Sequence, residues 1–153
     1  MTAALQHVEE PNPISALFVG CSPGDPTALE HIFSHSNWVL QQVRTLSGAL
    51  ALLQLVPVPV VICEDRLPDG DWPVLLDRAG RHRRPPRVIV TSRFADDRLW
   101  AEVLNLGGYD VLPTPFRARE VFQSVRAAWD SWRFEHQNTV LAVEAPRQPQ
   151  PSM

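Results

Sequence analysis

Short apolar runs that alternate along the chain with helical patterns constrain the fold more than any other feature. Four runs are apolar without the alternation of a half-buried strand, and a fifth is weaker. They are Ala16–Val19, Val58–Cys63, Val88–Thr91 and Val111–Leu112, with Trp38–Leu40 as the weaker one. Continuous apolar runs of this length favour strands buried on both faces, as in a parallel sheet.

Each run is followed by a segment with helical spacing of apolar residues. These segments are Thr27–Phe33, Leu46–Leu55, Trp72–Ala79, Asp96–Leu106 and Arg117–Phe134. Thr45 is expected to cap the second helix, and Gly107-Gly108 to end the fourth. A strand followed by a helix, repeated in this way, predicts a doubly wound α/β fold with helices on both faces of the sheet. Ligands of such folds bind at the carboxyl ends of the strands.

The length of 153 residues argues for one domain. We expect a flexible N-terminal extension over 1–13, a folded domain over 14–135 and a flexible Pro/Gln-rich tail over 136–153. We expect no output domain after the last helix, because only this tail follows it. The first residues do not resemble a secretory signal, and the longest apolar stretch is too short to span a bilayer. We therefore expect a cytoplasmic protein that binds no membrane.

The charge excludes several classes of function. The net charge is −3, which argues against a nucleic-acid clamp. All 14 basic residues are arginines, so chemistry that needs a lysine ammonium is excluded. The two cysteines, Cys21 and Cys63, are too few for a disulfide-rich scaffold.

Three strand-end segments occur in an order and spacing that resemble the receiver domain of two-component response regulators. They are Val60–Gly70, Val88–Ser92 and Gly107–Phe116, and the likeness covers about Ile14–Trp132. The resemblance implies a five-stranded parallel sheet of the flavodoxin-like, CheY-like type, with strand order 2-1-3-4-5. It also implies a bacterial signalling module and not an enzyme.

A receiver domain accepts a phosphoryl group on an Asp that lies four residues before a loop proline. Four residues before Pro68, this sequence has Glu64, whose carboxylate extends one methylene further. A displacement of about 1 Å can cost a hundredfold in rate. Glu64 is thus either a built-in imitation of the phosphorylated state or an inert carboxylate at a strand end.

The other positions of the phosphorylation site are mostly changed. Gly20 and Cys21 stand where receivers have the acidic pair that holds Mg²⁺, so we expect Mg²⁺ binding to be weak or absent, and no other metal site. Thr91 keeps the hydroxyl with which receivers contact the phosphoryl oxygens. Thr114 replaces the lysine that precedes Pro115, and a cis peptide is plausible there. Val111 stands at the position where receivers have an aromatic switch residue. Because these groups act together, we expect no conventional Asp phosphorylation.

Two alternatives remain open. In the first, the chain is still a phosphoacceptor in a phosphorelay and uses the neighbouring Asp65, although strand alternation would point this side chain away from Glu64. In the second, the chain is a small-molecule or redox sensor that uses the space left by Gly20, Cys21 and Thr114. Cys21 and Cys63 follow neighbouring strands and could form a redox bridge.

In receivers, the fourth helix, fifth strand and fifth helix often form a face for dimers or partners. The candidate residues for such a face are Trp100, Tyr109, Arg119, Arg126 and Trp129. Alternation places Tyr109 on the same side as Val111. We therefore expect an atypical receiver that binds an unidentified protein partner, with a homodimer as one form of this interaction.

Two further patterns have plain structural interpretations. The cations Arg78, Arg81, Arg83, Arg84 and Arg87 precede the fourth strand and read as solvated charges at a helix end. They could also meet an acidic partner or nucleic acid. His31 and His35 are four residues apart without a visible third metal ligand, so they are expected on the surface of the first helix.

Overall fold

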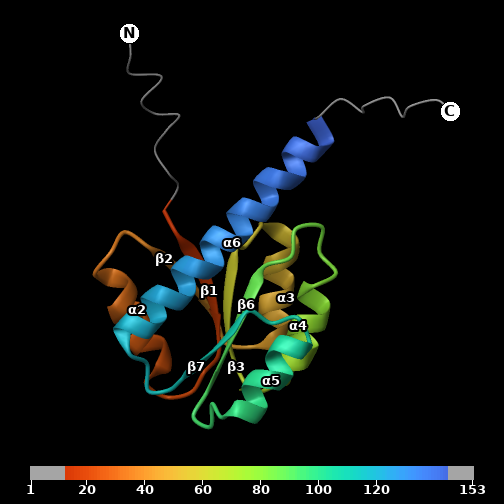
Figure 1. The fold of residues 1–153 in the computed structure, drawn as a ribbon. Coiled ribbons are helices and arrows are strands. Elements are labelled where there is room, and N and C mark those ends of the chain that lie inside the picture. Colours follow the sequence, from red (N-terminus) through yellow and green to blue (C-terminus); the bar gives the residue numbers. More distant parts are fainter. Residues whose placement is uncertain (1–12, 145–153) are drawn as a thin grey trace, which may run out of the picture.

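The computed structural model describes residues 13–144, with side chains described for 13–135. Its main sheet has five parallel strands in the order β2-β1-β3-β6-β7 (Figure 1). The strands are β1 (Ser15–Val19), β2 (Val39–Val43), β3 (Val60–Glu64), β6 (Arg87–Ser92) and β7 (Asp110–Pro113). When these five strands alone are numbered in chain order, their order in the sheet is 2-1-3-4-5. The predicted fold class and strand order are confirmed.

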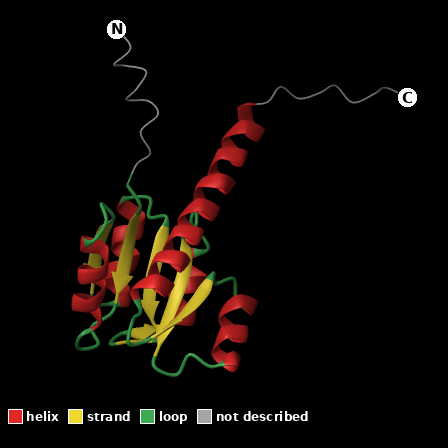
Figure 2. Cartoon of the chain, turned by 60° about the vertical axis from the view of Figure 1, so that its left-hand side comes forward, coloured by secondary structure: helices red, strands yellow, loops and turns green. Residues whose placement is uncertain are grey.

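Helices cover both faces of the sheet, as Figure 2 shows. One layer holds α2 (Asp25–Ser34) and α6 (Ala118–Glu144), and the other holds α3 (Leu46–Leu55), α4 (Trp72–Ala79) and α5 (Asp97–Asn105). Every residue of the central strand β3 is buried, which explains why its sequence is apolar without alternation. Among the described residues, no helix is both long and apolar enough to cross a membrane.

The local signals for helix ends agree with the structure. The hydroxyl of Thr45 accepts a hydrogen bond from the Gly48 amide at 3.0 Å and so caps α3. Gly107 adopts a positive φ of 96° directly after the last turn of α5, a conformation that favours glycine. The Thr114-Pro115 peptide is cis.

The last helix is longer than the sequence pattern predicts. We expected the helix to end near Phe134 and a flexible tail to start at residue 136, but α6 continues to Glu144. Residues 136–144 contain neither Pro nor Gly, and the first helix breaker after them is Pro146. The expected extension over 1–12 and the rest of the tail, 145–153, lie outside the described residues.

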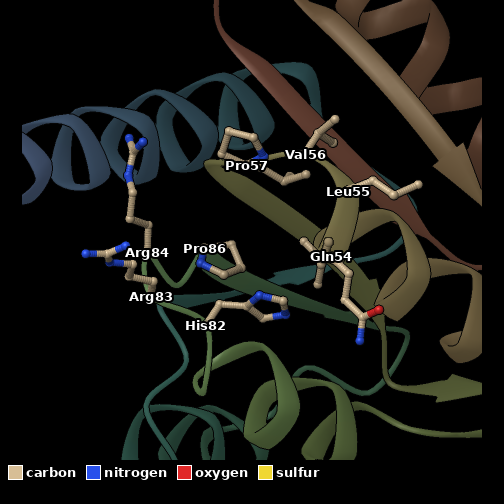
Figure 3. A pocket seen from close by; sticks show the side chains of 10 residues that line it. Gln54, Leu55, Val56, Pro57, His82, Arg83, Arg84 and Pro86 are labelled. Carbon is tan, nitrogen blue, oxygen red and sulfur yellow. The ribbon is translucent and has the colours of Figure 1, made fainter.

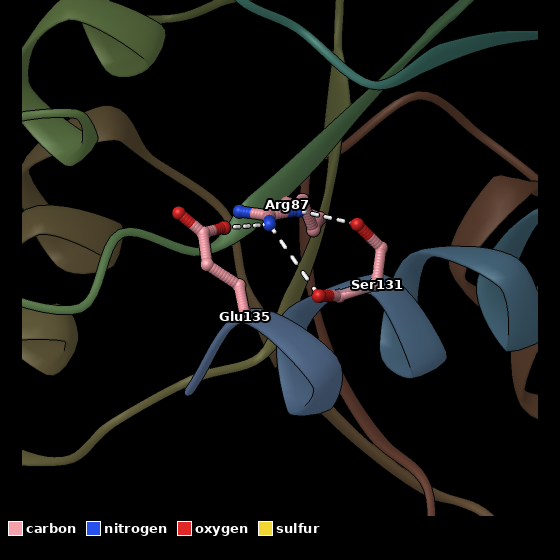
Figure 4. A network of polar contacts seen from close by, with 3 residues as sticks. All are labelled: Arg87, Ser131 and Glu135. Atoms are coloured by element: carbon pink, nitrogen blue, oxygen red, sulfur yellow. Dashed lines mark hydrogen bonds and ion pairs between the residues drawn. The ribbon is translucent and has the colours of Figure 1, made fainter. Parts of the chain in front are cut away.

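The helix α6 is tied to the beginning of β6 by Arg87. The Arg87 guanidinium donates to Ser131 Oγ at 3.1 Å and forms an ion pair with Glu135 (Figure 4). Arg87 is thus a structural contact of the strand and does not belong to a free basic surface.

A two-stranded hairpin between β3 and α4 was not anticipated. Its strands are β4 (Arg66–Leu67) and β5 (Gly70–Asp71), and Leu67 is buried. In its turn, the Asp69 carboxylate accepts hydrogen bonds from the amides of Leu46 at 2.7 Å and Ser47 at 2.9 Å. The hairpin therefore caps the first turn of α3 from another part of the chain.

Replacing Asp69 with Asn is expected to lower the stability of the fold. Hydrogen bonds from the Ser47 and Leu46 amides lower the pKa of Asp69 from its ordinary value of 3.8. The carboxylate's contribution is therefore present above pH 3.8 and is lost as the pH falls through the lowered pKa. Urea midpoints of the two proteins should differ near neutral pH and converge in acid. Asp71→Asn is the matched control, because the Asp71 side chain makes no capping bond to α4.

Candidate functional site

A polar cavity opens at the carboxyl ends of β3 and β6 and beside the start of α2. Its volume is about 280 Å³. Its lining residues come from the last residues of β3 and β6 and from the segments that follow β1, β3 and β6: Ser22, Asp25, Glu64, Asp65, Arg66, Thr91, Ser92, Arg93 and Phe94. This is the edge of a doubly wound sheet at which ligands bind.

Glu64, the last residue of β3, is the most buried acid of the cavity, with an exposed fraction of 4%. Its carboxylate accepts a hydrogen bond from the Ser22 amide at 2.9 Å and another from the Ser22 hydroxyl at 2.5 Å. Both carboxylate oxygens are thus engaged by the loop between β1 and α2. Hydrogen bonds to a buried charge offset its desolvation and hold the side chain in one place.

Gly20 provides the space that Glu64 needs. A Cβ at position 20 would lie 2.5 Å from Glu64 Cγ and closer still to the carboxyl atoms. The Glu64 side chain therefore fills the volume that a side chain at residue 20 would occupy. The sequence analysis identified Gly20 and Glu64 separately and missed Ser22, which joins them.

Asp65 lies in the same cavity, which contradicts the expectation that it points away from Glu64. Its carboxylate accepts a hydrogen bond from Ser92 Oγ at 2.8 Å. Alternation applies only inside a regular strand, and β3 ends at Glu64, one residue earlier. The structure thus brings two carboxylates, Glu64 and Asp65, to one cavity.

A third carboxylate, Asp25, begins α2 at the rim of this cavity. Partial burial raises the pKa of Asp25, the nearby Glu64 charge raises it further, and Arg93 partly offsets both. Asp25 is thus both the helix-start acid that its position indicates and part of the site. Burial is the larger cause of the raised pKa, and the nearby Glu64 charge disfavours a second negative charge at Asp25.

Thr91 is buried with an exposed fraction of 1%, and its Oγ1 has no hydrogen-bond partner among the described residues. Leaving a buried hydroxyl unpaired is costly, so such a group calls for an explanation. Thr91 is next to Glu64 in the ladder between β3 and β6, yet Glu64 bonds to Ser22 and not to Thr91. The two residues therefore do not form one hydrogen-bonded unit.

The other candidate residues, which are Cys21, Cys63, Val111, Thr114 and Pro115, do not line the cavity. Cys21 is half-buried, Thr114 is half-buried, Pro115 is exposed and Val111 packs in the apolar layer beneath α3, α4 and α5. Cys63 is fully buried, and burial together with the charges of Glu64 and Asp65 raises the pKa of its thiol. Both cysteines are free thiols. A raised thiol pKa disfavours the reactive thiolate at Cys63.

Two of the acids that line the cavity already accept hydrogen bonds from serine hydroxyls. Glu64 is satisfied by Ser22, Asp65 accepts from Ser92, and Gly20 and Cys21 offer no oxygen side chain. No group of three His, Cys, Asp or Glu residues in the described part of the chain is placed to hold a metal. His31 and His35 are exposed on α2, where their rings contact each other edge to face.

Only some of the residues expected on a partner face are exposed. Trp100, Arg119 and Arg126 are exposed on α5 and α6. Tyr109 is half-buried against the layer of α2 and α6, whereas Val111 packs in the opposite layer. The alternation assumed for Tyr109 fails because β7 begins after it, at Asp110. Trp129 is 7% exposed, so it is a core residue and not part of the face.

Comparison with known proteins gives one consistent result. No family model matches this sequence, and a search of curated proteins finds no match. Among solved structures, the signal receiver domain of an HD-domain-containing protein from Pseudomonas fluorescens Pf-5 is similar, with a TM-score of 0.76 and 26% identity. That similarity covers 84% of this chain and 95% of that one.

Two further receiver domains support the same fold. The receiver domain of Francisella response regulator 1452 has a TM-score of 0.71 and 20% identity, over 78% of this chain and 98% of that one. The beryllofluoride-activated NtrC4 receiver domain, which is a dimer, has a TM-score of 0.71 and 19% identity, over 77% of this chain and 98% of that one.

Proposed function

We propose that this chain, which has the fold of a response-regulator receiver domain, is an atypical receiver that signals by binding a protein partner in the cytoplasm, without phosphorylation of an Asp. The observation that supports this proposal most is the state of Glu64. A carboxylate that both the Ser22 amide and the Ser22 hydroxyl already hold is a poor nucleophile. It is also one methylene longer than the Asp that receivers use.

The surrounding residues support the same proposal. A phosphoryl group carries negative charge that must be neutralised as it is transferred. Thr114 stands at the position of the receiver lysine and supplies no charge, and two of the acids that line the cavity already accept hydrogen bonds from serine hydroxyls. The two arginines of the lining, Arg66 and Arg93, face three acids, Asp25, Glu64 and Asp65, so the formal charge of the cavity is negative before a phosphoryl group is added.

The structure does not favour Glu64 as an imitation of the phosphorylated state. Such an imitation would need a contact with the Thr91 hydroxyl, which receivers use to hold the phosphoryl group. The Glu64 carboxylate is turned instead to Ser22, and Thr91 Oγ1 makes no hydrogen bond among the described residues. We therefore propose that Glu64 holds the loop between β1 and α2 in one fixed conformation.

One observation favours a second candidate function, a phosphoacceptor that uses Asp65. This carboxylate lines the cavity together with the unpaired Thr91 hydroxyl. In that case an Asp65 oxygen would attack the phosphorus of an acyl phosphate, and the acyl carboxylate would leave with the electron pair of the broken P–O bond. The Ser92 hydroxyl, which donates to Asp65 at 2.8 Å, would have to release it first.

Incubation with acetyl phosphate and Mg²⁺ is expected to add no phosphoryl group to the protein. The measurement is the intact mass, with a receiver domain that has the usual Asp as the positive control. An added phosphoryl mass that disappears in Asp65→Asn would establish the second candidate and overturn the first. Glu64→Gln serves as the matched control, because it alters the neighbouring carboxylate and leaves Asp65 in place.

A further inference from the structure

A groove lies at the opposite edge of the sheet from the candidate site, beside the beginnings of β3 and β6. Its first hollow, of about 210 Å³, is lined by residues 53–58 together with His82, Arg83, Arg84 and Pro86 (Figure 3). A second hollow, of about 490 Å³, shares Gln54 and His82 with the first and continues between α3 and α4. We call the two together the α3–α4 groove.

One wall of the groove is apolar and exposed to solvent. Leu55 is 79% exposed and Val56 is 40% exposed, although both are large hydrophobic residues. Pro57 follows them in the same lining. In Figure 3 these side chains stand on one wall of the hollow, and His82, Arg83 and Arg84 stand on the other. Adjacent exposed apolar side chains rimmed by polar ones are typical of interaction sites.

The rim of the groove is basic. Arg78, Arg81, His82, Arg83 and Arg84 line the two hollows, and the described lining residues include no Asp or Glu. Asp77 pairs with Arg81 at 2.9 Å from outside the lining. Arg84 lies over the Trp132 ring at 4.5 Å. A groove with this combination fits an extended segment that carries both carboxylates and aliphatic side chains.

Residues 1–12 have this chemistry. They include Leu5, Val8 and the adjacent acids Glu9 and Glu10, and they lie outside the described residues. They also enter the fold next to the groove. Ala16 of β1 pairs with Val60 of β3, which places Ile14 opposite Val58, a residue of the groove lining. Neighbouring strands are about 4.8 Å apart, and twelve extended residues reach about 40 Å.

We propose that residues 1–12 dock in the α3–α4 groove of the same chain. Glu9 and Glu10 face the arginine rim, and Leu5 and Val8 cover Leu55 and Val56. The residues after Glu144 are a poorer match, because 145–153 contain Arg147 and no acid.

Amide hydrogen exchange of the full chain tests this proposal. The amides of Val56 and His82 donate hydrogen bonds to carbonyls in the last helical turns beside the groove. Their exchange rates therefore indicate whether the groove is covered. Replacing Glu9 and Glu10 together with Gln is expected to speed their exchange about threefold to tenfold, the range that two surface ion pairs support. Added salt should speed the wild-type exchange in the same way, because the pairs are exposed to screening.

The controls distinguish the proposal from its alternatives. The double variant Glu30→Gln/Glu102→Gln removes the same charge at exposed positions on α2 and α5 and should leave these amides unchanged. Glu10→Arg should be rescued in part by Arg83→Glu. Equal exchange in wild type and Glu9→Gln/Glu10→Gln would overturn the proposal. Protection that is lost on dilution would also overturn it, since the occupant would then be a second copy.

Discussion

Replacing Gly20 with alanine is expected to displace the Glu64 carboxylate from Ser22 and to lower the free energy of unfolding by about 2–3 kcal/mol. The new Cβ would overlap the Glu64 side chain, which would have to move away from residue 20 into the cavity that it lines. The side chain must then leave the two hydrogen bonds that Ser22 donates, and the half-buried Ser22 amide loses its acceptor. Urea unfolding of both proteins measures the difference.

A second background separates this effect from a general intolerance of alanine at position 20. In Glu64→Ser the side chain is too short to reach the space above Gly20, so Gly20→Ala should cost little there. The coupling energy between the two positions, measured by a double-mutant cycle, should reach about 1–3 kcal/mol. An equal cost of Gly20→Ala in both backgrounds would show that Glu64 does not occupy this space.

Replacing Trp129 with alanine is expected to lower the free energy of unfolding by about 3–5 kcal/mol, the usual cost of removing a large aromatic side chain from a core. Trp129 is 7% exposed, belongs to the apolar layer of α2 and α6, and stacks on Trp132 with ring centroids 6.1 Å apart. Its loss leaves a cavity that the rigid helix α6 closes only in part.

Trp100→Ala is the matched control for this variant. Trp100 is 49% exposed on α5, and its indole makes a long contact of 3.4 Å with Asp110. Removing it should cost less than about 1 kcal/mol, within the range of surface substitutions. If the two variants lost equal stability in a urea titration, the assignment of Trp129 to the core and Trp100 to the surface would be wrong.

The sequence was sufficient for the strands because burial on both faces leaves a strong pattern, and the resemblance to receiver domains supplied their order. Val60–Cys63 and Val88–Val90 are continuous apolar runs, as expected for interior strands of a parallel sheet that are buried on both faces. The helix pattern around Trp129 was equally clear. Deciding that Trp129 is buried, and not Trp132 or Trp100, required the packing of α6 on the sheet.

The candidate site was harder to predict because its residues lie where strands end. Alternation placed Asp65 away from Glu64 and Tyr109 beside Val111, and both placements were wrong, since each residue lies outside its strand. Ser22 left no signal in the sequence, because its role depends on the path of a loop and on the missing side chain at Gly20. The same holds for Asp69, which acts across 23 residues on the amide of Leu46.

A thermal melt with and without Mg²⁺ and beryllofluoride, a phosphoryl mimic, tests most directly whether the cavity has lost the phosphoryl site of a receiver. A ligand at a hundred times its dissociation constant stabilises the fold by about 2.7 kcal/mol, which raises Tm by several degrees. We predict no change in Tm, because Glu64 is held by Ser22 and the described residues include no group of three His, Cys, Asp or Glu placed to hold a metal ion. A rise of several degrees would contradict this account and place the phosphoacceptor function first.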